Sequence, residues 1–109
     1  MKVAYIFSTP NSHYILKNMI VPQLEKDTHG FTVLGMFFFL DNTYFLQKGD
    51  SIGEALSAIA KKTGMLLMGC DKCIYEREIK DLVDGAALGC FPDLNTALTG
   101  SGVEQVITL

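Results

Sequence analysis

Cys70 and Cys73 lie where an apolar stretch of the sequence gives way to a polar one. Residues 65–68 are a short apolar run typical of a buried strand that ends in Gly69 and Cys70, and a helix is expected to follow. Unpaired backbone N–H groups at the start of a helix favour a thiolate over a thiol. We therefore predict that Cys70 is a nucleophilic thiol, with a small buried hydrophobic residue as the alternative interpretation.

Cys73 gives the pair the C-x-x-C spacing of thioredoxin-type redox sites. The chain contains no tryptophan, and no cis-proline candidate is evident opposite the motif, although both are usual in such sites. Cys73 is thus a resolving thiol, a second sulfur acceptor or a helix residue that faces the core. Nearby charges oppose one another, because Lys72 and Arg77 are basic whereas Asp71 and Glu76 are acidic.

Cys90 and Asp93 extend the pattern to C-x2-C-x16-C-x2-D. This spacing is compatible with a zinc or iron–sulfur site if two neighbouring strands bring the loops together. A fourth soft ligand is missing, and an ordinary α/β core needs no metal to hold it. We expect neither a metal nor a cofactor, and a metal site built on Cys70, Cys73 and Cys90 is kept as the alternative.

The two histidines admit a chemical and a structural interpretation. His13 follows the first predicted strand and is either an acid–base partner for a thiolate or a capping or solvent-facing residue. His29 lies at a predicted helix end, where a cation favours the helix dipole, and we interpret it as structural. Residues 8–12 could cradle an anion, but they lack glycine and match no phosphate-loop spacing.

Short strands and helices alternate along the whole chain. Strands are predicted at residues 2–8, 31–40, 65–68, 86–91 and 103–109, and helices from 14 to a stop at 28–30, from 51 to 61–62, from 71 or 73 to 82, and at 92–98. This order predicts a single three-layer α/β/α domain over residues 1–109, with a mostly parallel five-stranded open sheet. Reactive groups in such folds gather at the carboxyl ends of the strands.

Local signals set the predicted helix ends. Asn11 or Ser12 is available to cap the first helix, and Pro22 must interrupt or kink it. Ser51 with Glu54 three residues later forms a capping-box pattern at the start of the second helix.

The composition indicates which binding partners and which cellular compartment to expect. The 109 residues are 49% hydrophobic and 19% charged, which suffices for a globular core, and the net charge of -3 leaves no basic excess for nucleic acid. No apolar run approaches the length of a membrane span or a signal-peptide core. Three cysteines without framework spacing favour a reducing compartment, so we expect a cytoplasmic protein.

Four segments in order resemble a known family. They are residues 36–44 (MFFFLDNTY), 65–70 (MLLMGC), 84–89 (DGAALG) and 103–109 (VEQVITL). Together they are similar to the DsrE/DsrF/TusD-like (YchN-like) sulfur-carrier family over nearly the whole chain. The resemblance implies that Cys70 occupies the position of the persulfide-bearing cysteine and that Arg77 falls on a basic position that some members have in the next helix.

The resemblance also implies a function. The chain would be an intracellular sulfur-relay protein, and so a possible sulfurtransferase, that accepts sulfur as a persulfide on Cys70 and passes it to a partner's thiol. Its partners would be sulfur donor and acceptor proteins. The chain would itself form a homo- or hetero-oligomer. No direct contact with nucleic acid or membrane is expected. The family has small apolar residues after the cysteine, whereas this chain has Asp71, Lys72 and Cys73. Two alternatives are a redox protein that cycles a Cys70–Cys73 disulfide and a non-enzymatic oligomeric binding module.

Overall fold

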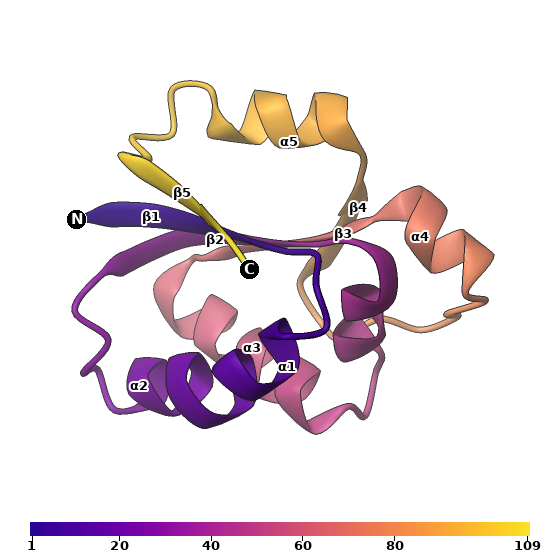
Figure 1. The fold of residues 1–109 in the computed structure, drawn as a ribbon, viewed down its shortest axis with the longest axis horizontal. Helices are drawn as coiled ribbons and strands as arrows, with labels where there is room; N and C mark the ends of the chain where they lie inside the picture. Colours follow the sequence, from indigo (N-terminus) through magenta and orange to yellow (C-terminus); the bar gives the residue numbers. More distant parts are fainter.

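Parallel strands form the centre of the molecule (Figure 1). The computed structural model describes residues 1–109. The strands are β1 (Lys2–Phe7), β2 (Thr32–Phe38), β3 (Leu66–Cys70), β4 (Ala86–Gly89) and β5 (Gln105–Thr108). They form one five-stranded sheet in the order β4-β3-β2-β1-β5, and every neighbouring pair is parallel. The predicted α/β class with a parallel five-stranded sheet is confirmed.

Helices cover both faces of this sheet. They are α1 (Ser12–Ile15), the π-helical segment η1 (Leu16–Ile20), α2 (Val21–Glu25), the 3₁₀ helix η2 (Leu40–Leu46), α3 (Ser51–Thr63), α4 (Asp71–Glu76) and α5 (Phe91–Leu98). Helices α1, α2 and α3 lie on one face, α5 lies on the other, and α4 lies beyond the end of β3 (Figure 1). The three predicted layers are therefore present. None of the helices has the length and apolar character needed to cross a membrane.

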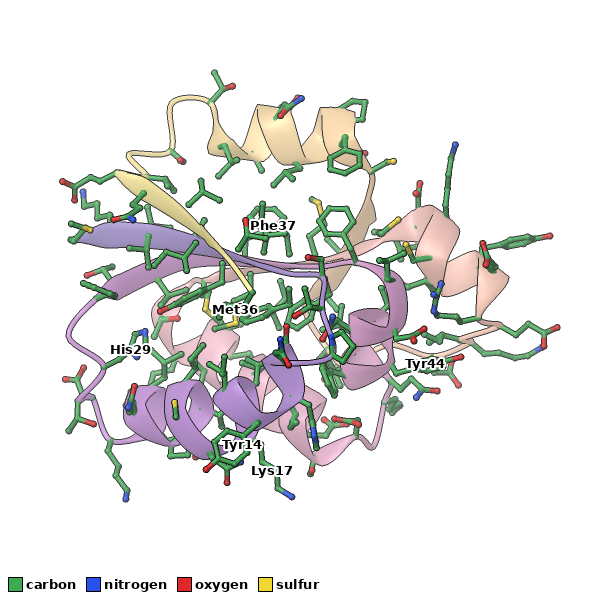
Figure 2. The ribbon with its side chains drawn as sticks, in the orientation of Figure 1. Tyr14, Lys17, His29, Met36, Phe37 and Tyr44 are labelled. Carbon is green, nitrogen blue, oxygen red and sulfur yellow. The ribbon has the colours of Figure 1, made fainter.

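Strand β2 contributes side chains to both apolar layers. Figure 2 shows neighbouring Met36 and Phe37 on opposite sides of the sheet, as the two-residue period of a strand requires. Met36 joins the larger core cluster, which includes Phe38 and Leu56. Phe37 joins the smaller cluster beneath α5 with Leu94. Burial on both faces explains why the sequence of this strand is almost continuously apolar.

The first helical run differs from a regular α-helix. It begins at Ser12, and the side chain of Asn11 at its N-cap makes no capping hydrogen bond, so the predicted cap is absent. The interruption predicted from Pro22 is confirmed, since the π-helical segment η1 comes just before α2, in whose first turn this proline lies. Proline lacks an N–H and crowds the preceding turn, which a wider π turn accommodates. The run ends at Glu25, before the predicted stop, because Asp27 adopts a left-handed φ of 57°.

Helix α3 starts as predicted, but a different residue caps it. The Asp50 carboxylate accepts hydrogen bonds from the N–H groups of Ile52 and Gly53, and Ser51 is already helical. Glu54 reaches back to the N–H of Gly49 instead. The capping-box interpretation was therefore wrong by one residue, because the carboxylate of Asp50 takes the orphan N–H groups.

Helix α4 is shorter than the predicted helix, which continued to residue 82. It ends at Glu76, and Glu78 adopts a left-handed φ of 54° that a helix does not tolerate. The following segment pairs elsewhere, since the N–H of Val83 donates to the carbonyl of Leu46 at 2.8 Å. Packing of Val83 in the core therefore overrides local helix propensity.

Candidate thiol site at the carboxyl end of β3

Cys70 is both the last residue of β3 and the N-cap of α4. Its Sγ accepts a hydrogen bond from the backbone N–H of Cys73 at 3.3 Å. Only 7% of the residue is exposed. Strands β2 and β4 flank β3, and Cys70 is paired in register with Gly89 of β4. The predicted strand-to-helix location is confirmed, and so is the proximity of helical N–H groups to the sulfur.

Gly69 allows α4 to turn back tightly onto the strand that carries Cys70. A Cβ at this position would lie 2.7 Å from Cδ1 of Ile74 and 2.9 Å from Cδ1 of Leu46. Real Cβ atoms do not approach other atoms so closely, so the ends of these two side chains would have to move to admit a larger residue. Glycine thus lets Ile74 of α4 and Leu46 of η2 pack directly against the strand beside Cys70.

The pKa of the Cys70 thiol is raised from its ordinary value. Burial is the largest cause, and a hydrogen bond with the Cys73 thiol adds to it. The backbone N–H groups of Cys73 and Lys72 lower the pKa, as predicted for a helix start, but burial outweighs them. The sequence indicated the effect of the N–H groups but left the net direction of the Cys70 pKa open, and burial decides it.

Cys73 is half-buried, and a second element holds its sulfur. The backbone N–H of Leu40, the first residue of η2, donates to the Cys73 Sγ at 3.2 Å. Leu40 reaches this position with a left-handed φ of 54°, a conformation that costs energy for a residue with a Cβ. The C-x-x-C pair thus lies between its own helix and η2.

Two buried polar side chains fix the backbone of η2. The hydroxyl of Thr43 donates to the carbonyl of Leu40 at 2.7 Å, and the amide of Asn42 donates to the carbonyl of Thr9 at 3.1 Å. Thr43 is fully buried and Asn42 is 5% exposed. In the sequence these residues belong to the family-like segment 36–44 and lie between a predicted strand and a predicted helix, with no role of their own expected. The signal for their role is a pair of polar residues directly after an apolar strand, whereas nothing in the sequence indicates the N–H of Leu40.

Arg77 connects the end of α4 to η2. Its Nε donates to the carboxylate of Asp41 at 2.8 Å, and its Nη1 donates to the carbonyl of Cys73 at 3.3 Å. The carboxylate raises the pKa of the guanidinium further. The guanidinium of Arg77 is paired with Asp41. The positive charges of Arg77 and Lys72 are not among the causes that shift the pKa of Cys70.

Cys90 lies at the start of another helix. It is the N-cap of α5, and its backbone N–H donates to the carboxylate of Asp93 at 2.8 Å. All three cysteines are free thiols. No three His, Cys, Asp or Glu side chains are arranged to hold a metal ion, so the structure does not assemble the alternative site on Cys70, Cys73 and Cys90.

Neither histidine contacts a cysteine. His13 stacks on Phe45, with ring centroids 5.5 Å apart and planes at 14°. It lines an open cavity of about 340 Å³ together with Ser8, Thr9 and Asp41. His29 lies at the opposite end of the sheet (Figure 2), where its ring bonds to the Tyr5 hydroxyl at 2.7 Å. The structural interpretation of His29 is thus supported by its contacts.

Exposed apolar side chains lie on several elements at the end of the sheet that carries the cysteine pair. Large ones lie on the elements that follow β2, β3 and β4, and their exposed fractions are 53% for Leu40, 87% for Tyr75 and 61% for Phe91. Leu88 of β4, 57% exposed, lies with Tyr75 beside an open groove next to α4. Apolar side chains are therefore exposed on elements that follow three neighbouring strands of the sheet.

No family model matches the chain, and no curated protein matches it. Solved structures do resemble it. The ychN protein of E. coli superposes with a TM-score of 0.70 at 18% identity, covering 99% of this chain and 97% of that chain. A protein of unknown function from Methanobacterium thermoautotrophicum gives 0.67 at 14% identity, covering 99% and 97%. A conserved protein of unknown function from Bacteroides thetaiotaomicron gives 0.66 at 10% identity, covering 99% and 94%. The chain therefore has the fold of the ychN protein, and identities this low show the fold alone.

Proposed function

We propose that this chain is a cytoplasmic sulfur-relay protein of the DsrE/TusD type that carries a persulfide on Cys70. The observation that carries the proposal is the position of Cys70. It lies at the carboxyl end of a central strand, at the turn into α4, with a backbone N–H on its sulfur. This is where a parallel α/β sheet presents its reactive groups. The resemblance in sequence and the likeness in fold to the ychN protein support the same assignment.

The proposed reaction moves one sulfur atom and no net electrons. The Cys70 thiolate attacks the outer sulfur of a donor persulfide, a new S–S bond forms on Cys70, and the donor leaves as a thiolate. A partner's thiolate then attacks the outer sulfur of the Cys70 persulfide, and Cys70 leaves as a thiolate. Each step is a displacement at sulfur, so no oxidant, reductant or cofactor takes part. Because burial raises the Cys70 pKa, loss of the thiol proton is part of the first step.

The surface around the cysteines favours protein partners. The exposed side chains of Leu40, Tyr75 and Phe91 supply apolar contact area close to the thiols. The net charge of -3 favours neither nucleic acid nor an anionic membrane surface. We therefore propose donor and acceptor proteins as partners, and further copies of the chain or related chains as neighbours in an oligomer.

A second candidate is a thiol–disulfide redox function. It is favoured by the contact between the backbone N–H of Cys73 and the sulfur of Cys70, which brings two free thiols together at the start of α4. A disulfide between them would need an external oxidant and would release two hydrogens. The third possibility, a binding module without chemistry, is favoured by the burial of Cys70.

Loading with a persulfide donor distinguishes these functions. Trypsin cuts after Lys72, so residues 63–72 with Cys70 and residues 73–77 with Cys73 form separate peptides, and Cys90 lies on a third. The reduced protein is incubated with a small-molecule persulfide, alkylated, digested and analysed by mass. We expect one additional sulfur at equilibrium on the Cys70 peptide, and none there in Cys70→Ser. Cys90→Ser is the matched control and should load normally. Loss of two hydrogens that needs both Cys70 and Cys73 would favour the redox function, and no reaction would favour the binding module.

A further inference from the structure

The two thiols of the pair differ in access to solvent. Cys70 is 7% exposed, whereas Cys73 is half-buried on the first turn of α4. The hydrogen bond from Leu40 to the Cys73 sulfur is exposed, but the one from Cys73 to the Cys70 sulfur is partly buried. A donor persulfide that arrives from solvent therefore reaches Cys73 before it reaches Cys70.

The sulfur of Cys73 is also fixed in position. Leu40 holds it through a backbone N–H at 3.2 Å, and Leu40 adopts a left-handed φ to do so. Thr43 fixes the carbonyl of Leu40, and Arg77 ties the Cys73 carbonyl to Asp41. A helix residue that merely filled space would need none of these contacts. Strained backbone that is held by several interactions is typical of functional positions.

We propose that Cys73 is the first acceptor thiol and that Cys70 is the sheltered thiol to which the sulfur then moves, an inference that rests on the sulfur-relay function proposed above. In this reaction sequence the direct attack by Cys70 is replaced by two steps. The Cys73 thiolate first attacks the outer sulfur of the donor persulfide, and the donor leaves as a thiolate. Cys70 then attacks the outer sulfur of the Cys73 persulfide, and its proton passes to the departing Cys73 sulfur. Two displacements move one sulfur inward without an oxidant or a reductant.

The arrangement gives each thiol a distinct task. An accessible thiol exchanges readily with a donor, but it also exchanges with any other thiol in solution. A persulfide on the buried Cys70 undergoes such exchange more slowly but can still be attacked by an acceptor thiol. The pair thus accepts sulfur quickly and retains it, which a single cysteine in either environment does less well.

The test follows the location of the sulfur over time. The protein is mixed with a small-molecule persulfide, quenched by alkylation from milliseconds to minutes, and digested with trypsin to separate the Cys70 and Cys73 peptides. We expect the additional sulfur first on residues 73–77 and later on residues 63–72. In Cys73→Ser the Cys70 peptide should load at least tenfold more slowly but to the same final extent. In Cys70→Ser the sulfur should remain on Cys73.

Matched variants separate failure of this inference from failure of the sulfur-relay function. Cys90→Ser removes a half-buried thiol outside the pair and should load with wild-type kinetics. Wild-type rates of Cys70 loading in Cys73→Ser would overturn the first-acceptor role while leaving the relay intact. Absence of additional sulfur on both peptides of the wild-type protein would overturn the relay, and the inference with it. Circular dichroism of both serine variants checks that they are folded.

Discussion

The backbone N–H of Leu40 donates a hydrogen bond to the Sγ of Cys73 across 3.2 Å, although the two residues are 33 positions apart in sequence. Arg77, the C-cap of the helix α4 that carries Cys73, donates its Nε to the carboxylate of Asp41, the residue after Leu40, at 2.8 Å. Helix α4 and the 3₁₀ helix η2 are therefore joined at two adjacent points. The environment of Cys73 depends on both connections.

Loosening the ion pair should expose Cys73. In Asp41→Asn the charged hydrogen bond to Arg77 is lost, so α4 and η2 separate more often and the Cys73 sulfur becomes more accessible. We expect Cys73 to be alkylated by iodoacetamide several-fold faster than in the wild-type protein, with Cys90 unchanged as an internal reference. Asp81→Asn, which removes an exposed carboxylate without a partner, is the control. Equal Cys73 rates in both variants would show that the ion pair does not hold the two elements together.

A side chain at Gly69, the residue before Cys70, should lower stability slightly. In Gly69→Ala the new methyl group meets only side-chain ends of Ile74 and Leu46, which can shift, so we expect a loss in the free energy of unfolding near or below the lower end of the about 1–3 kcal/mol that overpacking costs. Urea denaturation measures this loss. The double variant Gly69→Ala with Ile74→Val should recover part of it, because the clashing Cδ1 methyl is removed. If the two losses simply add, the clash is not the cause.

The reactivity of Cys70 should rise at a higher pH than that of an ordinary thiol. Its pKa is raised by burial first and by the neighbouring Cys73 thiol second. The midpoint of its alkylation rate against pH is therefore expected above the usual value of about 8.5. In Cys73→Ser the midpoint should move down but stay raised, since burial persists. A wild-type midpoint below the ordinary value would show that the backbone N–H groups dominate.

The same pKa shift predicts how stability changes with pH. A thiol whose pKa is higher in the folded than in the unfolded state contributes stability that is fully present below the unfolded pKa. This contribution is lost as the pH rises through the folded pKa. The free energy of unfolding of the wild-type protein should therefore fall more steeply above about pH 8.5 than that of Cys70→Ala. Parallel curves for the two proteins would contradict the shift.

His29 should lower stability in acid. Burial lowers its pKa, and its ring nitrogens contact the Tyr5 hydroxyl and the side-chain amide oxygen Oε1 of Gln23. Stability from the neutral ring is therefore fully present above the unfolded pKa of about 6.5 and is lost as the pH falls. Urea denaturation at several pH values should show this loss in the wild-type protein and in His13→Gln, but not in His29→Leu.

The variant His29→Leu also removes a partner from the buried Tyr5. An unsatisfied buried hydroxyl costs about 1–3 kcal/mol, so His29→Leu should be less stable at neutral pH. Adding Tyr5→Phe to this variant removes the unpaired hydroxyl and should recover part of the loss. An additive double variant would indicate that the hydrogen bond carries no net stability.

The sequence allowed the sheet and the place of Cys70 to be predicted, because both depend on local patterns. Apolar runs such as residues 31–40 identify buried strands, and a polar residue after Gly69 and Cys70 marks the start of a helix. Strand alternation with helices then determines a parallel sheet. The C-x-x-C spacing likewise identified Cys73 as a neighbour of the first thiol.

The features that could not be predicted from the sequence depend on contacts between residues that lie far apart in it. The N–H of Leu40 is a backbone group, so no residue type indicates that it will reach Cys73. The direction of the Cys70 pKa shift depends on how deeply α4 and η2 bury the sulfur, which follows from packing at Gly69. The early end of α4 depends on Val83 entering the core beside Leu46.

Delivery of sulfur to an acceptor shows whether Cys70 both receives sulfur and passes it on. The protein is loaded with an isotopically labelled persulfide, freed of excess donor, and mixed with a cysteine-containing acceptor peptide. Mass analysis follows the label on residues 63–72 and on the acceptor. We predict that the label lost from the Cys70 peptide equals the label gained by the acceptor. Cys70→Ser should deliver far less, because its more accessible Cys73 persulfide is lost to free thiol while the excess donor is removed. Label that stays on the wild-type protein, or equal delivery by Cys70→Ser, would show that Cys70 does not relay the sulfur.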